Sequence, residues 1–184
     1  MRILAIIPAR GGSKRLERKN IYPIWGKPML YWAIKACKES KYYVEPWVST
    51  EDEEVKSVAI KYGAKVHNRS PKLAKDKVYK QAAIREAAKY VFEAQGKYDI
   101  VISLQANSPQ IKSEHLDEAI DVFREHERDE IFSVDEKLMQ NAAFRIFKSD
   151  YVFQEDLSTN CGVFVCPLHD VHTIEDVRYI ENEI

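Results

Sequence analysis

Residues 1–21, MRILAIIPARGGSKRLERKNI, combine a predicted buried strand with a basic loop that contains two glycines. The apolar run at 2–8 ends in proline and has no polar alternation, which is typical of a strand buried on both faces of a parallel sheet. In open α/β sheets, ligands bind beyond the carboxyl ends of the strands, and the loop after the first strand is a preferred place. The loop that begins at Ala9 is therefore predicted to bind a ligand.

Strand and helix patterns alternate along the rest of the chain. A helix is predicted from Pro28, where apolar residues recur at helical spacing. Further strands are predicted at 44–49, 64–68 and 99–104, and further helices from about Asp52, over 84–96, and from a cap at Ser113. Weaker strand patterns follow at 131–136, 143–147 and 162–166, with a final helix at 173–184.

This alternation predicts βαβ units and hence an α/β fold of three layers, in which helices cover both faces of a mainly parallel sheet. The length of 184 residues suits one ordinary domain, and the 45% of apolar residues can supply its core. We expect a single domain over residues 1–184 that is less regular after about residue 130.

Composition argues against several classes of partner. The 28 basic and 29 acidic residues nearly cancel, so neither nucleic acid nor a membrane surface is predicted as a partner. The apolar run at the start is too short for a transmembrane helix, and charged residues follow it instead of a cleavage site. The three cysteines form no CxxC pair, which favours a reducing compartment. A cytoplasmic protein is expected.

The basic cluster is thus a local feature of the glycine loop. Its five cations are Arg10, Lys14, Arg15, Arg18 and Lys19. Backbone N–H groups in a glycine-containing loop can surround a phosphate, and the added cations suit a polyphosphate. The spacing excludes a P-loop, because Gly26-Lys27 is followed by proline, and it excludes the G-x-G-x-x-G dinucleotide fingerprint. The alternative is a solvated surface loop.

Four ordered segments resemble the acylneuraminate cytidylyltransferase family. They are IPARGGSKRLERKNI at 7–21 followed by GKPML at 26–30, VSTEDEE at 48–54, YGAKVHNRSPKLAKD at 62–76, and LQANSP at 104–109. Only Glu17 departs from the first motif, and the resemblance covers about residues 2–126. The RKN at 18–20 favours the acylneuraminate branch over the related octulosonic acid enzymes.

The resemblance implies a Rossmann-like nucleotidyltransferase sheet and transfer of CMP from CTP to a sialic-acid-like nonulosonic keto-acid sugar, with release of pyrophosphate. It implies that the triphosphate is held by Arg10 and by the amides of Gly11, Gly12, Ser13 and Lys14. Lys19 is then expected to stabilise charge at the attacked α-phosphate, and Arg10 and Lys19 are the expected catalytic residues. Asn20 and Arg69 match nucleoside-contacting positions, and Gln105 is expected to face the acceptor sugar.

The C-terminal part departs from the family pattern. The family's D-I-D-T signature holds Mg²⁺ with two aspartates, and here DVHT at 170–173 keeps Asp170 but has His172 in place of the second aspartate. A hard ion prefers oxygen ligands, so the expected Mg²⁺ or Mn²⁺ site is weakened. The segment between NCGVFV at 160–165 and this signature is also shorter than in the family, where that region contacts a partner subunit. A homodimer is expected from the resemblance alone.

Two alternatives remain open at this point. The chain can be a nucleotide-binding homologue whose chemistry is weakened or redirected, or a nucleotidyltransferase for another sugar. The other histidines lie in polar contexts without a partner at catalytic spacing, so no catalytic role is predicted for them. These are His67, His115, His126 and His169.

Overall fold

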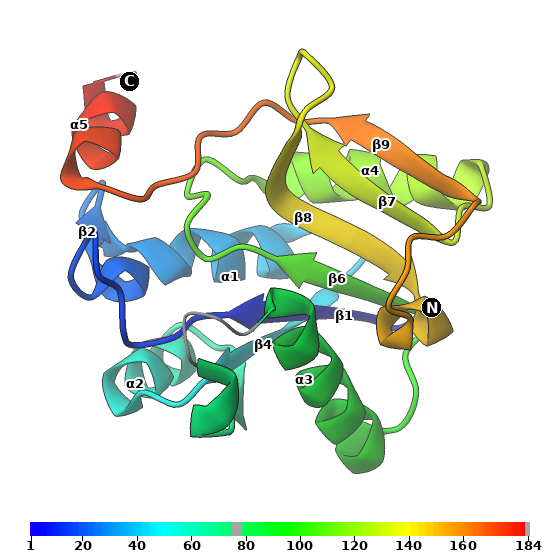
Figure 1. The fold of residues 1–184 in the computed structure, drawn as a ribbon, viewed down its shortest axis with the longest axis horizontal. Helices are drawn as coiled ribbons and strands as arrows, with labels where there is room; N and C mark the ends of the chain where they lie inside the picture. The colour runs from blue at the N-terminus through cyan, green and yellow to red at the C-terminus, as the bar shows by residue number, and fades with distance from the viewer. Residues whose placement is uncertain (75–78, 183–184) are drawn as a thin grey trace.

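A seven-stranded sheet runs through the part of the chain that the structure describes (Figure 1). The structure is a computed structural model, which describes residues 1–74 and 79–182, and only the backbone at residue 142. The sheet strands are β1 Ile3–Pro8, β4 Val44–Thr50, β5 Lys65–Asn68, β6 Ile100–Leu104, β7 Glu130–Val134, β8 Gln140–Lys148 and β9 Cys161–Val165. A small hairpin is formed by β2 Pro23–Ile24 and β3 Lys27–Pro28.

The helices alternate with these strands as the sequence predicts. They are α1 Met29–Glu39, α2 Glu53–Lys61, α3 Lys80–Gln95, α4 Ser113–Glu125 and α5 Ile174–Asn182, with short 3₁₀ turns η1 Lys19–Ile21, η2 Pro71–Ala74 and η3 Ser149–Phe153. Residues 75, 76, 183 and 184, which fall in predicted segments, lie outside the described residues. Of the helices in the described ranges, none has the length and apolar character that crossing a bilayer requires.

The strand order is β5-β4-β1-β6-β8-β7-β9. β1 pairs in parallel with both β4 and β6, β4 with β5, and β7 with β9, whereas β8 is antiparallel to its two neighbours. The prediction of a mainly parallel sheet is therefore confirmed, with one reversed strand. The carboxyl ends of β1, β4, β5 and β6 consequently meet at one edge, where the glycine loop begins.

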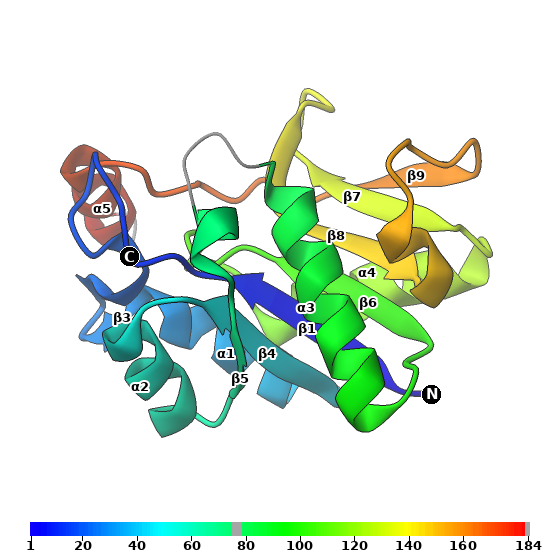
Figure 2. The same ribbon diagram turned by 60° about the horizontal axis from the view of Figure 1, so that its bottom comes forward.

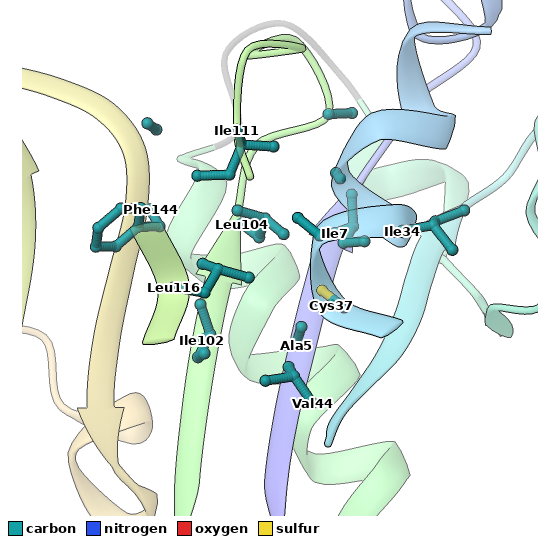
Figure 3. Packing of buried hydrophobic residues seen from close by; sticks show 14 of the residues in the cluster. Ala5, Ile7, Ile34, Cys37, Val44, Ile102, Leu104, Ile111, Leu116 and Phe144 are labelled. Carbon is teal, nitrogen blue, oxygen red and sulfur yellow. The ribbon is translucent and has the colours of Figure 1, made fainter. Parts of the chain in front are cut away.

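Helices cover both faces of the sheet (Figure 2). Side chains alternate along β1, so that Ala5 and Ile7 pack against α1, α2 and α4 while Leu4 and Ile6 pack against α3. Figure 3 shows the first of these cores, where Ile7 lies beside Leu104 and Ile34. Truncating such a fully buried side chain to alanine costs ~2–5 kcal/mol. The end of β1 is therefore a rigid base for the loop that follows it.

A third apolar cluster attaches the C-terminal segment to the N-terminal loop. Val171, Val177 and Ile180 pack with Leu16 and Ile24. Helix α5 starts with a capping box, in which the Thr173 N–H donates to Asp176 Oδ2 at 2.8 Å and the Asp176 N–H donates to Thr173 Oγ1 at 3.3 Å. These contacts place residues 170–172 beside the glycine loop, although they are far from it in sequence.

The predicted cap at Ser113 is wrong by one residue. Lys112 holds the N-cap position of α4, and its backbone N–H donates to His115 Nδ1 at 3.2 Å. Ser113 is the first helical residue and its hydroxyl donates to Glu114. The imidazole of His115, at the third helical position, therefore accepts from the N–H of the N-cap residue, as a Glu or Gln does in a capping box.

Candidate functional site

A polar cavity of about 260 Å³ lies at the carboxyl ends of β1, β5 and β6. Six of the predicted site residues, from separate sequence motifs, line it: Arg10, Ser13, Lys19, Asn20, Arg69 and Gln105. Gly11, Gly12, Lys14, Asp170 and His172 are not among its lining residues. The fold thus brings together the predicted nucleoside and acceptor residues with part of the predicted triphosphate loop.

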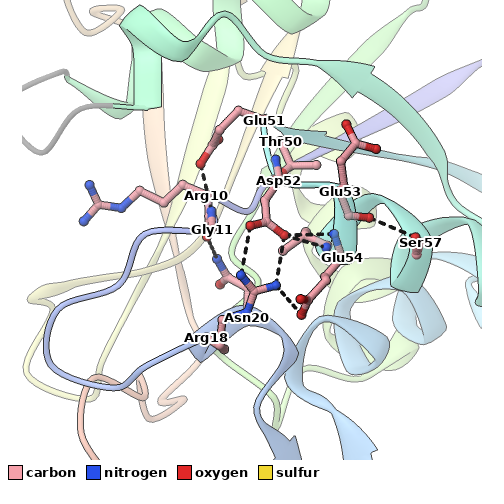
Figure 4. Close-up of polar contacts among 11 residues, drawn as sticks. Arg10, Gly11, Arg18, Asn20, Thr50, Glu51, Asp52, Glu53, Glu54 and Ser57 are labelled. Carbon is pink, nitrogen blue, oxygen red and sulfur yellow. Dashed lines mark hydrogen bonds and ion pairs between the residues drawn. The ribbon is translucent and has the colours of Figure 1, made fainter.

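The glycine loop is fixed to the start of α2 by ion pairs (Figure 4). Arg18 has left-handed backbone geometry with φ 54° and forms a bidentate pair with Asp52, at 3.0 and 3.1 Å. The same Asp52 caps α2 by accepting from the N–H groups of Glu54 and Val55. Hydrogen bonding to Asp52 raises the pKa of Arg18. Arg18 therefore holds the loop in place.

Gly11 stands where the loop passes closest to α2. A Cβ atom at Gly11 would lie 2.3 Å from Asp52 Oδ2, whereas a Cβ at Gly12 would meet nothing within 4 Å. The Gly11 N–H, which was predicted to bind phosphate, donates to Glu51 Oε1 at 2.8 Å. Glu51 was not predicted as a site residue. It lies in the VSTEDEE segment at 48–54, which was used only as evidence of family resemblance.

The turn η1 carries Lys19 and Asn20 into the cavity. Asn20 is buried, and its amide donates to the Arg10 carbonyl oxygen at 2.8 Å, which closes the loop on itself. Burial lowers the pKa of Lys19, the neighbouring Arg15 lowers it further, and Asp170 opposes the effect. Lys19 is therefore a partly desolvated amine, whose interaction with a phosphate is stronger than that of a surface lysine.

Arg69, directly after β5, is 6% exposed and is one of the residues that line the same cavity. Its Nη2 donates to the Ser49 carbonyl oxygen at 2.6 Å and its Nε to Ser49 Oγ at 3.3 Å. Burial lowers the pKa of Arg69, whereas the negative charges of Glu51 and Glu86 oppose this shift. The sequence predicted Arg69 as a nucleoside contact, and the cavity is a suitable place for one.

Gln105 carries an unused donor. Its backbone is fixed by a hydrogen bond to the Ala143 carbonyl at 2.9 Å. Its side-chain Nε2 is buried and has no hydrogen-bond partner among the described residues. An unsatisfied buried donor costs ~1–3 kcal/mol, which a ligand oxygen in the cavity can offset.

Lys80, the first residue of α3, is a further site residue that the sequence reasoning missed. It lines the cavity and also an adjoining one of about 250 Å³, whose walls include Ser103, Gln140 and Arg145. Burial lowers the pKa of Lys80, and Asp170 opposes this. Arg145 is paired with Glu130, whereas no ion pair of Lys80 is seen within the described ranges. A lone lysine in a helix gave no signal in the sequence.

The two expected metal ligands, Asp170 and His172, each contact another side chain of the protein. Ser108 Oγ donates to Asp170 Oδ1, and His172 Nδ1 lies 3.2 Å from Arg15 Nη2. Although burial opposes it, hydrogen bonds from His169, His172 and Thr173 hold the pKa of Asp176 below its usual range, because that carboxylate caps α5. No group of three or more potential ligand side chains is found in the described residues. An imidazole facing a guanidinium does not fit a magnesium ion.

A larger cavity of about 650 Å³ lies elsewhere, between α1, the start of α4 and α5. Its walls include Trp25, Trp32 and Ile180, and none of the predicted site residues. Among the described residues it shares no lining residue with the polar cavity, so the two cavities are separate.

The sheet, with its basic glycine loop at the carboxyl end of β1, has the α/β architecture of a nucleotidyltransferase-type domain. The fold is similar to a solved structure of CMP:2-keto-3-deoxy-manno-octonic acid synthetase complexed with CTP, with a TM-score of 0.77 at 16% identity, over 100% of this chain and 98% of that one. The family model for Cytidylyltransferase matches residues 4–159, and the chain belongs to this family.

Two relatives are similar in sequence. N-acylneuraminate cytidylyltransferase A of Danio rerio is 39% identical over 132 residues, and the match covers 72% of this chain but only 30% of that protein. Pseudaminic acid cytidylyltransferase of Campylobacter jejuni is 34% identical over 158 residues, covering 85% of this chain and 68% of that protein. The chain therefore spans less than a third of the Danio rerio relative.

Proposed function

We propose that the chain transfers CMP from CTP to a nonulosonic keto-acid sugar and releases pyrophosphate. The observation that carries the proposal is the convergence of Arg10, Lys19, Arg69 and Gln105 on one cavity at the end of β1. Family membership and the names of the two relatives support it. Their names specify N-acylneuraminate and pseudaminic acid as the acceptors.

In this proposal each group has a defined task. Arg69 and Asn20 hold the nucleoside, and Arg10, Ser13 and the loop amides hold the triphosphate. The sugar hydroxyl attacks the α-phosphate in line with the leaving pyrophosphate, and Lys19 stabilises the negative charge that accumulates there. Gln105 donates its unused N–H to the sugar, and the adjoining cavity with Lys80 receives the rest of this anionic acceptor.

A solved structure with a similar fold is a complex with manganese. In this chain Asp170 and His172 do not fit such an ion, so no step is assigned to it. The binding of Gly11 to Glu51 means that this amide reaches the triphosphate only if the Glu51 carboxylate moves away.

We further propose that the protein acts in the cytoplasm as a homodimer and that its partners are small molecules. CTP is available in the cytoplasm, and the near-zero net charge argues against nucleic acid or membrane partners. Strand β9 lies at the edge of the sheet with Val163 and Val165 half exposed, and an apolar edge strand suits pairing with a second copy. Light scattering after gel filtration tests the dimer.

Pyrophosphate release from CTP tests the activity. The assay uses a panel of keto-acid sugars, with Mg²⁺ and with Mn²⁺. Lys19→Met is expected to lower kcat at least ~100-fold because it removes a charge at the α-phosphate, whereas the matched control Lys89→Met, on the exposed face of α3, leaves kcat unchanged. Absence of release from every sugar under both metals would refute the proposal.

A second candidate is a homologue that binds CTP without turnover. The contacts of Asp170 with Ser108 and of His172 with Arg15 favour it, since both occupy the expected metal ligands. Under this alternative CTP raises the melting temperature, no sugar yields pyrophosphate, and His172→Asp restores metal-dependent turnover.

A further inference from the structure

A buried polar chain leads from the nucleoside residue Arg69 into the protein. Ser49, on β4, is 0% exposed and binds Arg69 twice, accepting from Nε at its hydroxyl and from Nη2 at its carbonyl. On the other side of the hydroxyl, His67 of β5 is 4% exposed and places Nδ1 at 3.0 Å from Ser49 Oγ. The register aligns Ser49 with His67, so the sheet itself sets this contact.

The donor in the contact between Ser49 and His67 depends on the tautomer of the imidazole. Ser49 Oγ accepts from Arg69 Nε and keeps its own proton, and we assign that proton to a hydrogen bond with an unprotonated His67 Nδ1. The remaining ring proton is on Nε2, which faces Glu86 Oε2 of α3 at 3.9 Å. That oxygen is buried without a hydrogen-bond partner among the described residues, so it can accept the proton if the two groups approach.

This arrangement leaves one edge of Arg69 for a ligand. The hydrogen bonds seen for Arg69 in the described residues use Nε and Nη2 and none uses Nη1, and Arg69 is one of the residues that line the cavity. This edge of the guanidinium carries only N–H donors and therefore requires acceptor atoms on the ligand. Cytosine presents two adjacent acceptors, O2 and N3, whereas uracil presents an N3–H donor beside its carbonyls. A guanidinium fixed in orientation therefore favours cytosine, and a mobile one discriminates less.

We propose that His67, acting through Ser49, is a positioning residue that orients Arg69 and thereby sets the preference of the site for cytosine over uracil. This inference rests on the proposed function, because it takes Arg69 as the residue that contacts the base. His67 itself does not line the cavity. Its effect is therefore on base discrimination and not on the triphosphate.

Calorimetric titration of CTP, UTP and inorganic tripolyphosphate tests the proposal. His67→Leu is expected to reduce the ratio of CTP to UTP affinity ~10-fold, the effect of one lost hydrogen bond, with unchanged tripolyphosphate affinity. His67→Asn is expected to keep the ratio within ~3-fold, because its Oδ1 can replace Nδ1 as acceptor for Ser49. If His67→Leu fails to fold, Ser49→Ala is a smaller change that is expected to reduce the ratio of CTP to UTP affinity by the same factor. The exposed control His126→Leu keeps the wild-type ratio.

The inference would be overturned if both His67→Leu and Ser49→Ala kept the wild-type ratio of CTP to UTP affinity. It would also be overturned if these variants lost affinity for tripolyphosphate to the same extent as for CTP. If the wild-type protein itself shows no preference for CTP, the proposed function fails instead. Nitrogen-15 NMR of the ligand-free protein then decides the positioning claim. We expect an unprotonated His67 Nδ1 and an Arg69 Nε–H that exchanges slowly, and faster exchange in Ser49→Ala. A rapidly exchanging Arg69 Nε–H in the wild type overturns it.

Discussion

Replacing Gly11 by alanine tests how closely the loop is fixed to α2. The new Cβ would lie 2.3 Å from Asp52 Oδ2 and 2.7 Å from Asp52 Cβ, so the aspartate must move. Asp52 cannot move without losing the cap of α2 and the pair with Arg18. The cap contributes ~1 kcal/mol, and the partly exposed ion pair up to ~1 kcal/mol. We therefore expect Gly11→Ala to lower the free energy of unfolding by about 2 kcal/mol, or ~4–8 °C in Tm for a chain of this size.

Gly12→Ala is the matched control. Both glycines lie outside the left-handed region of φ, and a Cβ at Gly12 meets nothing within 4 Å, so its effect should stay below ~0.5 kcal/mol. Urea denaturation of the two variants measures the difference. In an Asp52→Gly background the clash is absent, and adding Gly11→Ala should cost less than ~0.5 kcal/mol. Equal unfolding free energies for Gly11→Ala and Gly12→Ala would refute the reasoning.

Three further predictions concern the site. Lys80→Met should raise the KM for the acid sugar ~10-fold in initial-rate measurements at saturating CTP, and Lys80→Arg should raise it less. An unchanged KM in Lys80→Met would exclude Lys80 from acceptor binding. His172→Asp should tighten Mg²⁺ binding to the CTP complex ~10-fold by calorimetry, because an oxygen ligand replaces an imidazole; equal affinities would place the metal elsewhere. Burial lowers the pKa of His67, and Arg69 lowers it further, whereas Glu86 opposes the shift. As the pH drops below the ordinary value of 6.5, the histidine of the unfolded chain is therefore protonated before that of the folded protein, and the free energy of unfolding falls. His67→Asn should lack that part of the loss in denaturation curves between pH 7 and pH 5, and identical pH profiles would contradict a buried neutral imidazole.

Much of the fold follows from local patterns. The unbroken apolar runs at β1 and β6 predicted buried parallel strands, and the helices between them have clear apolar stripes. The position of β8 between β6 and β7 could not be predicted, because strand order depends on long-range pairing that no local pattern encodes. The exact start of α4 was also missed, since histidine is an uncommon capping side chain.

The site shows the same division between local and tertiary information. Arg69 and Gln105 were predicted from motifs and lie in the cavity, as expected of ligand-contacting residues. The roles of Glu51 and Lys80 depend on segments that meet only in three dimensions. His67 lies in a polar sequence context from which no role was predicted, and pairing of β5 with β4 buries it against Ser49.

Following the α-phosphorus of CTP into a product distinguishes CMP transfer from simple hydrolysis or binding. The protein is incubated with keto-acid sugars and with CTP labelled at either the α- or the γ-phosphate, and the products are separated by charge. The account predicts that the α-label moves into an acidic CMP-sugar while the γ-label leaves as pyrophosphate. Recovery of the α-label only in CTP, CDP or CMP, with every sugar offered, would contradict it.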